Sequence, residues 1–447
     1  MKITVVGAGY VGLVSGACLA NIGHEVTCVE RDAARVTMLN NGIVPIYEPG
    51  LGRLIAANRA AERLDFTSDL AGSVGDADAV FIAVGTPSRT TDGVADLSHV
   101  YQAAREIAPA LRGHTLIVTK STVPVGTGDE IERVISKCNA SARFAVVSNP
   151  EFLREGSAIA DFRKPDRVVI GADDEGARRM MSAIYAPLRI ESRRMVYVSR
   201  RTAELIKYAS NSFLAMKVTF INEIADLCEK VDADVTDVAH GMGLDHRIGE
   251  SFLMAGPGIG GSCFPKDTLA LVKTAQDADS PVRLVEMTVA INDQRKRAMA
   301  KKVIRACGGS VRGKTIGILG LTFKPDTDDV REAVSLSIIR ALQDAGARVR
   351  AYDPEGMEHA RPHLPGVVFC PDAMSAASDV DALAIVTAWS AFRDLDLAQL
   401  KTVMADTRIV DFQNMLDPEV MRLAGFTYSG LGRGEADRSS YVVQAAE

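Results

Sequence analysis

The 447-residue sequence lacks several features that mark special classes of protein. No apolar run reaches the length of a bilayer crossing, because Gly, Asp or Lys interrupts the longest hydrophobic segments. The net charge is −6, and no basic tract of the kind that grips nucleic acid is present. A strand begins directly after Met1, which leaves no room for a signal peptide. The sequence therefore predicts a cytoplasmic protein that binds neither membrane nor nucleic acid.

The cysteines form no disulfide or metal pattern. They are odd in number and include neither a CxxC pair nor a cysteine–histidine cluster: Cys18, Cys28, Cys138, Cys228, Cys263, Cys307 and Cys370. This pattern is typical of reduced thiols and argues against a disulfide scaffold or a structural zinc site. We therefore predict no metal. An anionic ligand would have to be held by individually placed Lys and Arg side chains.

A glycine motif stands between the first strand, residues 3–6, and an Ala- and Leu-rich helix that ends near residue 22. The motif is Gly7-Ala8-Gly9-Tyr10-Val11-Gly12, and Glu30 follows its third glycine by eighteen positions, at the end of the next strand. In this context the first glycine permits the turn, the second admits a pyrophosphate and the third lets helix pack on strand. A purely structural turn is the alternative. Because a carboxylate at Glu30 binds ribose hydroxyls and repels a 2'-phosphate, the motif predicts NAD rather than NADP.

Polar residues follow several of the later strands. We expect strands at residues 77–84, 116–120, 144–148 and 167–170. Thr86, Thr122 and Glu151 stand just beyond three of these strand ends. Ligands of parallel α/β sheets bind at the carboxyl ends of the strands, so these side chains are placed to meet one. Any one of them could instead cap a helix or shape a turn, but their recurrence favours a site.

Residues 202–231 predict one long helix without Gly or Pro. Its apolar residues recur every three or four positions, which is typical of a core face or a subunit contact: Leu205, Ala209, Phe213, Met216, Phe220, Ile224, Leu227 and Val231. Lys207 and Asn211 are four residues apart and share a face, and Glu204 lies one turn before Lys207. The alternative interpretation is that these three side chains are ordinary polar residues exposed to solvent.

From about residue 301 the pattern of the first half restarts. Residues 313–321 predict a strand that leads into a glycine turn, and a helix follows near 335–345. Further strands are expected at 348–352, 382–386 and 408–411. The full GxGxxG is missing, so this half need not bind a dinucleotide, although a related nucleotide is plausible. Lys324 and Arg331 flank an acidic run and could contact phosphate, whereas residues 432–447 are expected to fray.

These patterns predict an α/β protein with two Rossmann-like, doubly wound parallel-sheet domains joined by a long central helical segment. The length agrees with more than one core. We place an NAD-binding domain at residues 1–200, a helical and dimerisation domain at 201–300, and a nucleotide-binding domain at 301–447.

Cys263 stands in a glycine-rich stretch, Gly258-Ile259-Gly260-Gly261-Ser262-Cys263-Phe264-Pro265-Lys266-Asp267. Glycines let backbone approach a ligand closely, and a thiol near positive charge can act as a thiolate nucleophile. The alternative is a small buried hydrophobe in a tight loop.

Together these segments resemble the UDP-glucose/GDP-mannose dehydrogenase family. The similarity covers all but about the last fifteen residues. It rests on the glycine motif, the Cys263 loop and five further stretches: Val84-Gly85-Thr86-Pro87, Ser121-Thr122-Val123-Pro124-Val125-Gly126-Thr127, Asn149-Pro150-Glu151-Phe152-Leu153-Arg154-Glu155-Gly156, Lys207-Tyr208-Ala209-Ser210-Asn211 and Phe323-Lys324-Pro325-Asp326-Thr327-Asp328-Asp329-Val330-Arg331-Glu332.

The resemblance implies an NAD-linked, four-electron oxidation of the primary alcohol of a nucleotide sugar to the uronic acid. Cys263 would form a thiohemiacetal, hydride loss would give a thioester, and water would release the acid. Lys207 and Asn211 would stabilise the oxyanion, and Asp267 with Lys207 would activate a water or alkoxide. Thr122 and Glu151 would position the water. The base of the first oxidation stays open.

The resemblance also implies two sets of binding residues. The cofactor would contact Gly7, Gly9, Tyr10, Val11, Gly12, Glu30, Arg35, Thr86, Thr122, Glu155, Lys266 and Arg331. The substrate would contact Phe152, Leu153, Arg154, Glu155, Lys207, Asn211, Arg247, Phe252, Leu253, Met254, Ala255, Gly256, Gly260 and Lys324. In this family Arg247 tends to reach a neighbouring subunit, so a homodimer through the central helix is expected.

Two stretches, residues 154–162 and 387–393, look like the UDP-glucose branch of the family, which predicts UDP-glucose as substrate and UDP-glucuronate as product. Ala388 replaces a glutamate common there, and Glu30 replaces the usual aspartate. GDP-mannose and UDP-N-acetylhexosamine are alternative substrates. A two-electron hydroxyacid dehydrogenase with a helix lysine as base, and a catalytically silent NAD sensor or scaffold, are the alternative functions.

Overall fold

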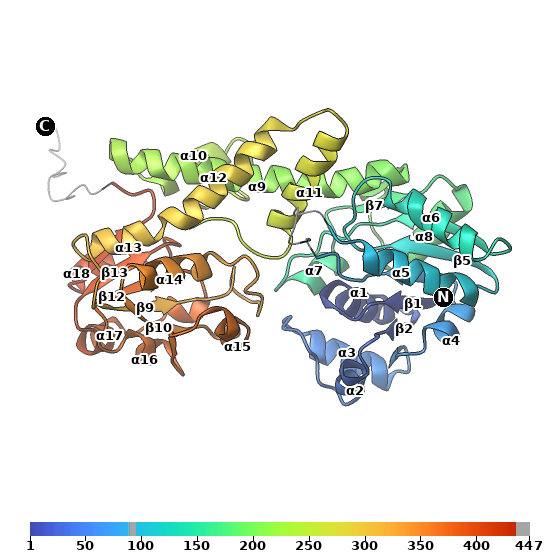
Figure 1. Cartoon of the computed structure of the whole chain (residues 1–447), viewed down its shortest axis with the longest axis horizontal. Coiled ribbons are helices and arrows are strands. Elements are labelled where there is room, and N and C mark those ends of the chain that lie inside the picture. Colours follow the sequence, from blue (N-terminus) through green and yellow to red (C-terminus); the bar gives the residue numbers. More distant parts are fainter. Residues whose placement is uncertain (88, 90–94, 435–447) are drawn as a thin grey trace, which may run out of the picture. The chain divides into compact units, whose positions relative to one another are not determined.

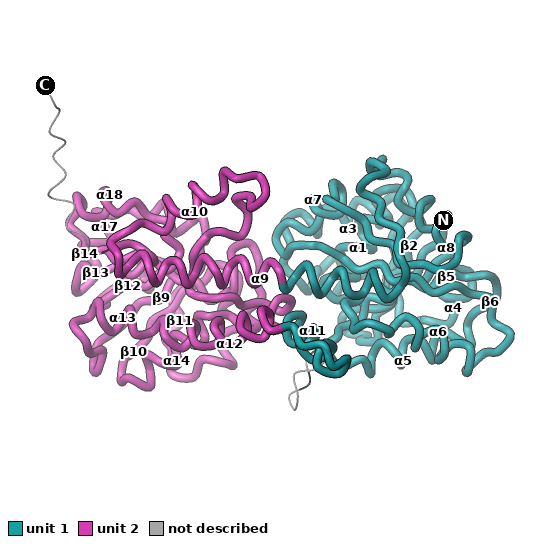
Figure 2. Tube along the Cα trace, turned by 90° about the horizontal axis from the view of Figure 1, so that it is seen from above, with its two compact units in different colours: residues 1–212, 266–282 teal, residues 213–265, 283–447 magenta. Residues whose placement is uncertain are grey.

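The computed structural model describes residues 1–87, 89 and 95–434 (Figure 1). The chain divides into two compact units, which Figure 2 colours separately. Unit 1 comprises Met1–Ser212 and Lys266–Val282, and unit 2 comprises Phe213–Pro265 and Arg283–Glu447. The predicted domain boundaries near residues 200 and 300 stay a prediction. Most of the stretch expected to fray lies outside the described residues.

Unit 1 is built on an eight-stranded sheet with the strand order β3-β2-β1-β4-β5-β6-β7-β8. Neighbouring strands are parallel except β6 and β7, which pair antiparallel. The strands are β1 (Lys2–Val6), β2 (Glu25–Val29), β3 (Leu64–Thr67), β4 (Ala79–Ile82), β5 (His114–Thr119), β6 (Arg143–Ser148), β7 (Val168–Gly171) and β8 (Met195–Val198). This order places the carboxyl ends of β1, β4, β5 and β6 side by side at one edge of the sheet.

Helices cover both faces of this sheet, because its strands bury side chains on both sides. In β4, Phe81 belongs to one core cluster and Val80 and Ile82 to another. The first cluster includes residues of α1, α3 and α7, and the second includes residues of α5 and α6. The helices of unit 1 are α1 (Tyr10–Asn21), α2 (Ala33–Asn40), α3 (Leu51–Ala60), α4 (Leu70–Gly75), α5 (Ser98–Ile107), α6 (Thr127–Cys138), α7 (Ala158–Arg163) and α8 (Glu175–Tyr185).

Unit 2 repeats the same topology in a smaller sheet. Its six strands are all parallel, and the order β11-β10-β9-β12-β13-β14 reproduces that of β3-β2-β1-β4-β5-β6. The strands are β9 (Thr315–Leu319), β10 (Arg348–Tyr352), β11 (Val368–Phe369), β12 (Ala382–Ile385), β13 (Arg408–Asp411) and β14 (Thr427–Gly430). The helices are α10 (Val235–Gly243), α12 (Arg283–Ala298), α13 (Ala300–Ala306), α14 (Val334–Asp344), α15 (Met357–Ala360), α16 (Ala373–Ala377), α17 (Leu397–Val403) and α18 (Pro418–Leu423).

Two helices run from one unit into the other along the chain. The long helix α9 (Arg200–Val231) begins two residues before the predicted start and ends where predicted, and α11 (Phe264–Asp277) directly follows Cys263. The predicted fold class, with two parallel-sheet regions and a long central helix, is confirmed. Within the described ranges, no helix combines the length and the apolar character that crossing a membrane requires.

Candidate active site

The glycine turn after β1 has room where a dinucleotide needs it. Gly7 has a φ of +102°, and a Cβ there would lie 2.8 Å from the Ala83 carbonyl oxygen. A Cβ on Gly12 would lie 1.8 Å from the Gly7 carbonyl oxygen, so only glycine lets α1 approach the turn this closely. A Cβ on Gly9 would meet nothing within 4 Å. The open space at Gly9 and the exposed amides at the start of α1 fit a pyrophosphate.

Glu30 follows β2 and stands beside this turn. Its carboxylate accepts hydrogen bonds from the amides of Ala8 (3.2 Å) and Asp32 (3.1 Å). Asp32 in turn caps α2 by accepting from the amides of Ala34 and Arg35. The carboxylate therefore sits next to the glycine motif, where a ribose bound at a Rossmann turn lies.

Tyr10 and Val11 begin α1, and the hydroxyl of Tyr10 is held within the protein. It donates a short hydrogen bond to Oε2 of the buried Glu48, whose carboxylate also accepts from the amides of Gly156 (2.7 Å) and Ala158 (2.8 Å). Burial, Glu48 and Glu155 all raise the pKa of Tyr10, so its hydroxyl stays protonated. Glu48 thus connects the glycine turn to the segment that begins at Phe152.

The polar residues after β4 and β5 contact one another, as neighbouring strands of a parallel sheet allow. The Thr86 hydroxyl donates to the Thr122 carbonyl oxygen (3.0 Å), and the Ser121 hydroxyl donates to the Val84 carbonyl oxygen (2.7 Å). These bonds fix the segment after β5 against the segment after β4. Glu151 accepts from the Leu153 amide and so shapes the start of its own loop.

Two buried polar groups join α9 to other segments of unit 1, one at this sheet edge and one on α11. The Nζ of Lys207 donates to Oε1 of Glu151 at 3.1 Å, and both side chains are only 5% exposed. One turn further along α9, the Nδ2 of Asn211 donates to Oδ2 of Asp267 at 2.6 Å. Lys266 Nζ donates to the other oxygen of Asp267 at 2.7 Å. Buried charges are stable only when paired in this way, and such groups cluster at functional sites.

The segment Phe152–Glu155 lies beside Lys207, a contact that the order of residues along the chain does not predict. The Nζ of Lys207 lies 5.2 Å from the centre of the Phe152 ring, and the guanidinium of Arg167 lies 3.6 Å from it. Arg154 is bound by Asp161 through its guanidinium and its amide. Burial lowers the pKa of Arg167, a residue that the sequence did not single out.

Cys263 belongs to unit 2, where glycines bring its loop close to the segment before α14. The Gly261 amide donates to the Arg331 carbonyl oxygen (3.0 Å), and Gly261 has a φ of +85°. A Cβ on Gly260 would lie 2.5 Å from the Glu332 carbonyl oxygen, and one on Gly261 would lie 2.7 Å from the Phe323 ring. Asn292 holds the loop by bonding both the amide and the carbonyl of Ile259.

The half-buried Cys263 immediately precedes α11, so it occupies the position where a helix favours negative charge. Five of the other six cysteines are buried: Cys18, Cys28, Cys228, Cys307 and Cys370. Burial raises the pKa of Cys18 and of Cys28 to about 12, which suppresses their thiolate forms. In the ranges that the structure describes, no group of three or more His, Cys, Asp or Glu side chains is arranged to hold a metal ion.

Arg247 and the predicted substrate loop, residues 252–256, lie in a stretch of unit 2 that side-chain and backbone hydrogen bonds order. Arg247 is exposed and paired with Asp245, and Lys217 Nζ donates to the carbonyls of Ile248, Gly249 and Ser251. Phe252 adopts a φ of +66°, and its ring packs 6.0 Å from that of Phe264.

In the same loop, Leu253 is buried, whereas Met254 is 77% exposed. Ala255 lies between Met254 and Gly256, whose amide donates to Asn222. The loop therefore presents both a rigid backbone and an exposed apolar side chain.

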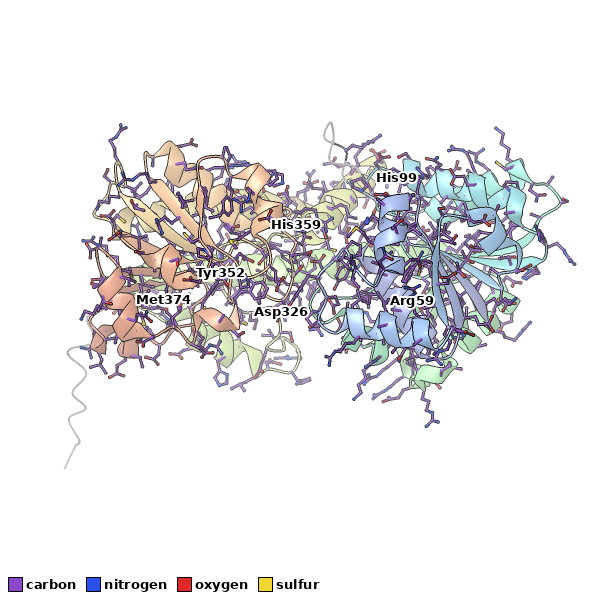
Figure 3. The ribbon with its side chains drawn as sticks, turned by 90° about the horizontal axis from the view of Figure 1, so that it is seen from below. Arg59, His99, Asp326, Tyr352, His359 and Met374 are labelled. Carbon is purple, nitrogen blue, oxygen red and sulfur yellow. The ribbon has the colours of Figure 1, made fainter. Side chains whose placement is uncertain are left out.

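The second glycine turn, after β9, is filled by the protein itself. A Cβ on Gly320 would lie 2.4 Å from Thr387. Asp353, which follows Tyr352 at the end of β10 (Figure 3), accepts from the amides of Leu321 and Thr322 and from the indole of Trp389. The Asp353 carboxylate is therefore fully buried, whereas Glu30 is only partly buried beside its own turn, so Asp353 cannot serve a ribose in the same way.

The predicted phosphate contacts of unit 2 lie on the loop that follows. Lys324 Nζ lies 5.5 Å from the Phe323 ring centre, and the guanidinium of Arg331 pairs with Asp329 at 2.8 Å. Asp326 has a φ of +62°, and the His359 ring contacts the Asp328 carbonyl oxygen at 3.0 Å; Asp326 and His359 are labelled in Figure 3. The loop is therefore held by several local bonds rather than by regular secondary structure.

Sequence reasoning did not find Glu48 and did not give Glu204 a role. Both carboxylates are buried and accept hydrogen bonds from segments more than 50 residues away. The only local signal was the position of Glu204 one turn before Lys207 on α9.

Comparison with known proteins gives consistent matches along most of the chain. Residues 1–189 match the NAD binding domain, residues 201–294 the central domain, and residues 317–418 the UDP binding domain of the UDP-glucose/GDP-mannose dehydrogenase family. The UDP-glucose 6-dehydrogenase of Rhizobium meliloti (strain 1021) is 60% identical over 97% of this chain and 100% of its own length.

Two further relatives are also named as UDP-glucose dehydrogenases. UDP-glucose 6-dehydrogenase TuaD of Bacillus subtilis (strain 168) is 45% identical over 97% of this chain and 93% of its own. The structure of a UDP-glucose dehydrogenase from the archaeon Pyrobaculum islandicum superposes with a TM-score of 0.89 at 38% identity, covering 96% of this chain and 97% of that one. This chain belongs to the UDP-glucose/GDP-mannose dehydrogenase family.

Proposed function

We propose that this protein is an NAD-dependent UDP-glucose 6-dehydrogenase that oxidises UDP-glucose to UDP-glucuronate through Cys263. The observation that carries the proposal is the 60% identity, over 97% of this chain, to a protein named UDP-glucose 6-dehydrogenase. The family's NAD binding domain, residues 1–189, contains the glycine turn and Glu30, whose geometry fits a dinucleotide. When bound, NAD supplies the hydride acceptor for each oxidation.

The second oxidation explains why a cysteine is needed. The sulfur of Cys263 adds to the aldehyde carbon of the sugar, and the resulting thiohemiacetal can lose its hydrogen as hydride. This leaves a thioester. Water then adds to the carbonyl carbon, the carbon–sulfur bond breaks, the thiol regains a proton and the acid leaves. A serine would leave a less labile ester.

The buried polar residues of unit 1 supply the groups that these steps require. Lys207 and Asn211 are proposed to stabilise the oxyanion of the adduct, since an ammonium and an amide donate from one helix face. Asp267, with Lys207, is proposed to activate a water or alkoxide, and Thr122 and Glu151 to position the water for hydrolysis. The ion pair of Lys207 with Glu151 supports this grouping.

The binding roles follow the same division. We propose that the cofactor contacts Arg35, Thr86, Glu155, Lys266 and Arg331 besides the glycine turn, Thr122 and Glu30. The nucleotide sugar is proposed to contact residues 152–155, Lys207, Asn211, Arg247, residues 252–256, Gly260 and Lys324. The match of residues 317–418 to a UDP binding domain supports a UDP-linked sugar. We also propose a homodimer formed through α9.

Product stoichiometry tests the reaction. Purified protein given NAD and limiting UDP-glucose is expected to form two NADH for each sugar consumed, with UDP-glucuronate as the product. Cys263→Ser should lower turnover by roughly 10³-fold or more, because the nucleophile is removed. Cys138→Ser, a change of an exposed thiol, serves as the matched control and should leave turnover unaltered.

Three results would contradict the proposal. One NADH per sugar with a stable aldehyde would mean a two-electron enzyme. Turnover of GDP-mannose or a UDP-N-acetylhexosamine without turnover of UDP-glucose would mean a different substrate. NAD binding without turnover of any nucleotide sugar would indicate a silent scaffold.

A further inference from the structure

The carboxylate of Glu204 is a buried junction of three segments. Glu204 is 3% exposed and lies on α9, one turn before Lys207. Its Oε2 accepts from the Gly126 amide at 2.6 Å, and its Oε1 accepts from the Gly128 amide at 2.8 Å and from the Ser148 hydroxyl at 2.9 Å. Hydrogen bonds to an ionised group are stronger than those between neutral groups, so this junction is rigid.

The three segments are those that carry the residues proposed to handle water. Gly126 precedes the first residue of α6 and Gly128 lies in its first turn, directly after the segment that contains Thr122. Ser148 is the last residue of β6, three positions before Glu151. Because Lys207 follows Glu204 by one helical turn, one carboxylate sets the relative positions of Thr122, Glu151 and Lys207.

The junction is also closely fitted. A Cβ on Gly128 would lie 3.0 Å from both Glu204 Oε1 and Ser148 Oγ, so a side chain at position 128 would push the carboxylate away. Burial raises the pKa of Glu204, whereas its three donors lower it. Because the pKa of Glu204 is raised on balance, the donors offset part of the cost of burying the charge.

A small cavity adjoins the junction. Its volume is about 10 Å³, which is close to the space that one water molecule needs. Its lining includes Thr122, Lys207, Glu204, Ser148 and Thr119. The Thr119 hydroxyl is buried and has no hydrogen-bond partner among the described residues, which is the environment that an ordered water satisfies.

We propose that Glu204 is a positioning residue for hydrolysis of the Cys263 thioester: it holds the Thr122 segment, the Glu151 strand end and the Lys207 helix in the arrangement that places water. The inference rests on the proposed function. It adds a residue that touches neither substrate nor cofactor and acts through Thr122, Glu151 and Lys207. In the step concerned, a water oxygen bonds to the thioester carbon, the carbon–sulfur bond breaks, and one proton passes to the sulfur.

The variant Glu204→Gln tests the proposal, because an amide keeps the shape but replaces one acceptor oxygen with a donor. We expect kcat to fall about 10- to 100-fold, the effect of losing one hydrogen bond to a charge, with both KM values within about twofold of wild type. Intact-mass spectrometry of enzyme quenched during turnover should show a larger fraction of Cys263 carrying the uronyl thioester. A general structural defect would not cause this accumulation.

Ser148→Ala removes only one donor and should change kcat and the thioester fraction in the same direction by less; it decides the question if Glu204→Gln does not fold. Glu223→Gln, an exposed carboxylate on the same helix, is the matched control and should match wild type. An unchanged kcat in Glu204→Gln, or a lower kcat without accumulated thioester, would overturn the inference. If wild type forms neither thioester nor two NADH from UDP-glucose, the proposed function itself fails.

Discussion

At the scale of single residues, burial determines what each thiol can do. Cys28 lies in β2 against α1, where a Cβ on Gly16 would lie 2.5 Å from its sulfur, and Cys18 lies on the buried face of α1. Both are small core residues whose thiolates are strongly disfavoured. Cys263 differs in each respect, because it is half-buried and directly precedes a helix.

The raised thiol pKa values make the stability of the fold depend on pH. In the unfolded chain these thiols lose their protons near pH 9, whereas in the folded protein they keep them up to about pH 12. Between these values the unfolded state binds fewer protons, so the free energy of unfolding should fall as the pH rises from about 9. Urea denaturation at a series of pH values measures this slope.

The double variant Cys18→Ala, Cys28→Ala should be less stable overall but should lose stability less steeply over the same pH range. Cys138→Ala, at an exposed position, should keep the wild-type slope. A double variant with the wild-type slope would show that the two buried thiols do not cause the effect.

Residue types with a distinctive motif could be predicted from the sequence, whereas buried acceptors could not. Lys207 and Asn211 were grouped by their spacing on one helix, and the structure gives each a buried carboxylate partner. Glu48 and Glu204 are ordinary glutamates in the sequence. Their partners lie 108 and 78 residues away, at Gly156 and Gly126, and no local pattern encodes such a bond.

At the scale of secondary structure, the two halves share a topology but differ in their turns. After β1 the chain enters α1 within four residues, whereas after β9 an irregular segment of fourteen residues precedes α14. Asp353 and Trp389 hold this longer segment. The sequence predicted the central strands of both sheets, because parallel strands buried on both faces are continuous apolar runs. It did not predict β3, β8, β11 and β14, which lie at the edges of the two sheets. The irregular segment could not be predicted, because long-range hydrogen bonds determine its path.

The connection through Glu48 predicts an energetic coupling between the glycine turn and α7. Tyr10→Phe and Glu48→Gln each weaken the bond between the Tyr10 hydroxyl and the carboxylate. We expect each to raise the dissociation constant for NAD about five- to tenfold, the net value of one ordinary hydrogen bond, because the bond lies beside the glycine turn and not on the cofactor itself. The double variant should bind no worse than Glu48→Gln, because the shared bond is lost only once. Calorimetric titration with NAD measures all three.

Glu130→Gln is the matched control for this cycle, since Glu130 pairs with Arg133 at the surface of α6 and exposed ion pairs contribute little. Its NAD affinity should equal that of wild type. Strictly additive effects of the two changes would contradict the coupling.

At the scale of the whole molecule, α9 leaves part of its predicted apolar stripe uncovered. Phe213, Phe220 and Leu227 recur every seven residues, so they lie on one face of the helix, and they are 57%, 46% and 54% exposed. Val231 extends this face. The sequence left open whether the stripe is core or subunit contact. Single exposed apolar residues are common, but an aligned row of large ones marks an interaction surface.

We expect a second copy of the chain to cover this row, because a two-fold axis brings the same helix face of both copies together. Wild-type protein should therefore have twice the chain mass of 47.8 kDa by light scattering coupled to size exclusion. Phe220→Asp places a charge on the row and should shift the mass to that of one chain. Leu423→Asp, at a leucine on α18 that is 72% exposed, should remain dimeric. A wild-type protein that runs as a single chain at micromolar concentration would contradict the dimer, and the row on α9 would then need another partner.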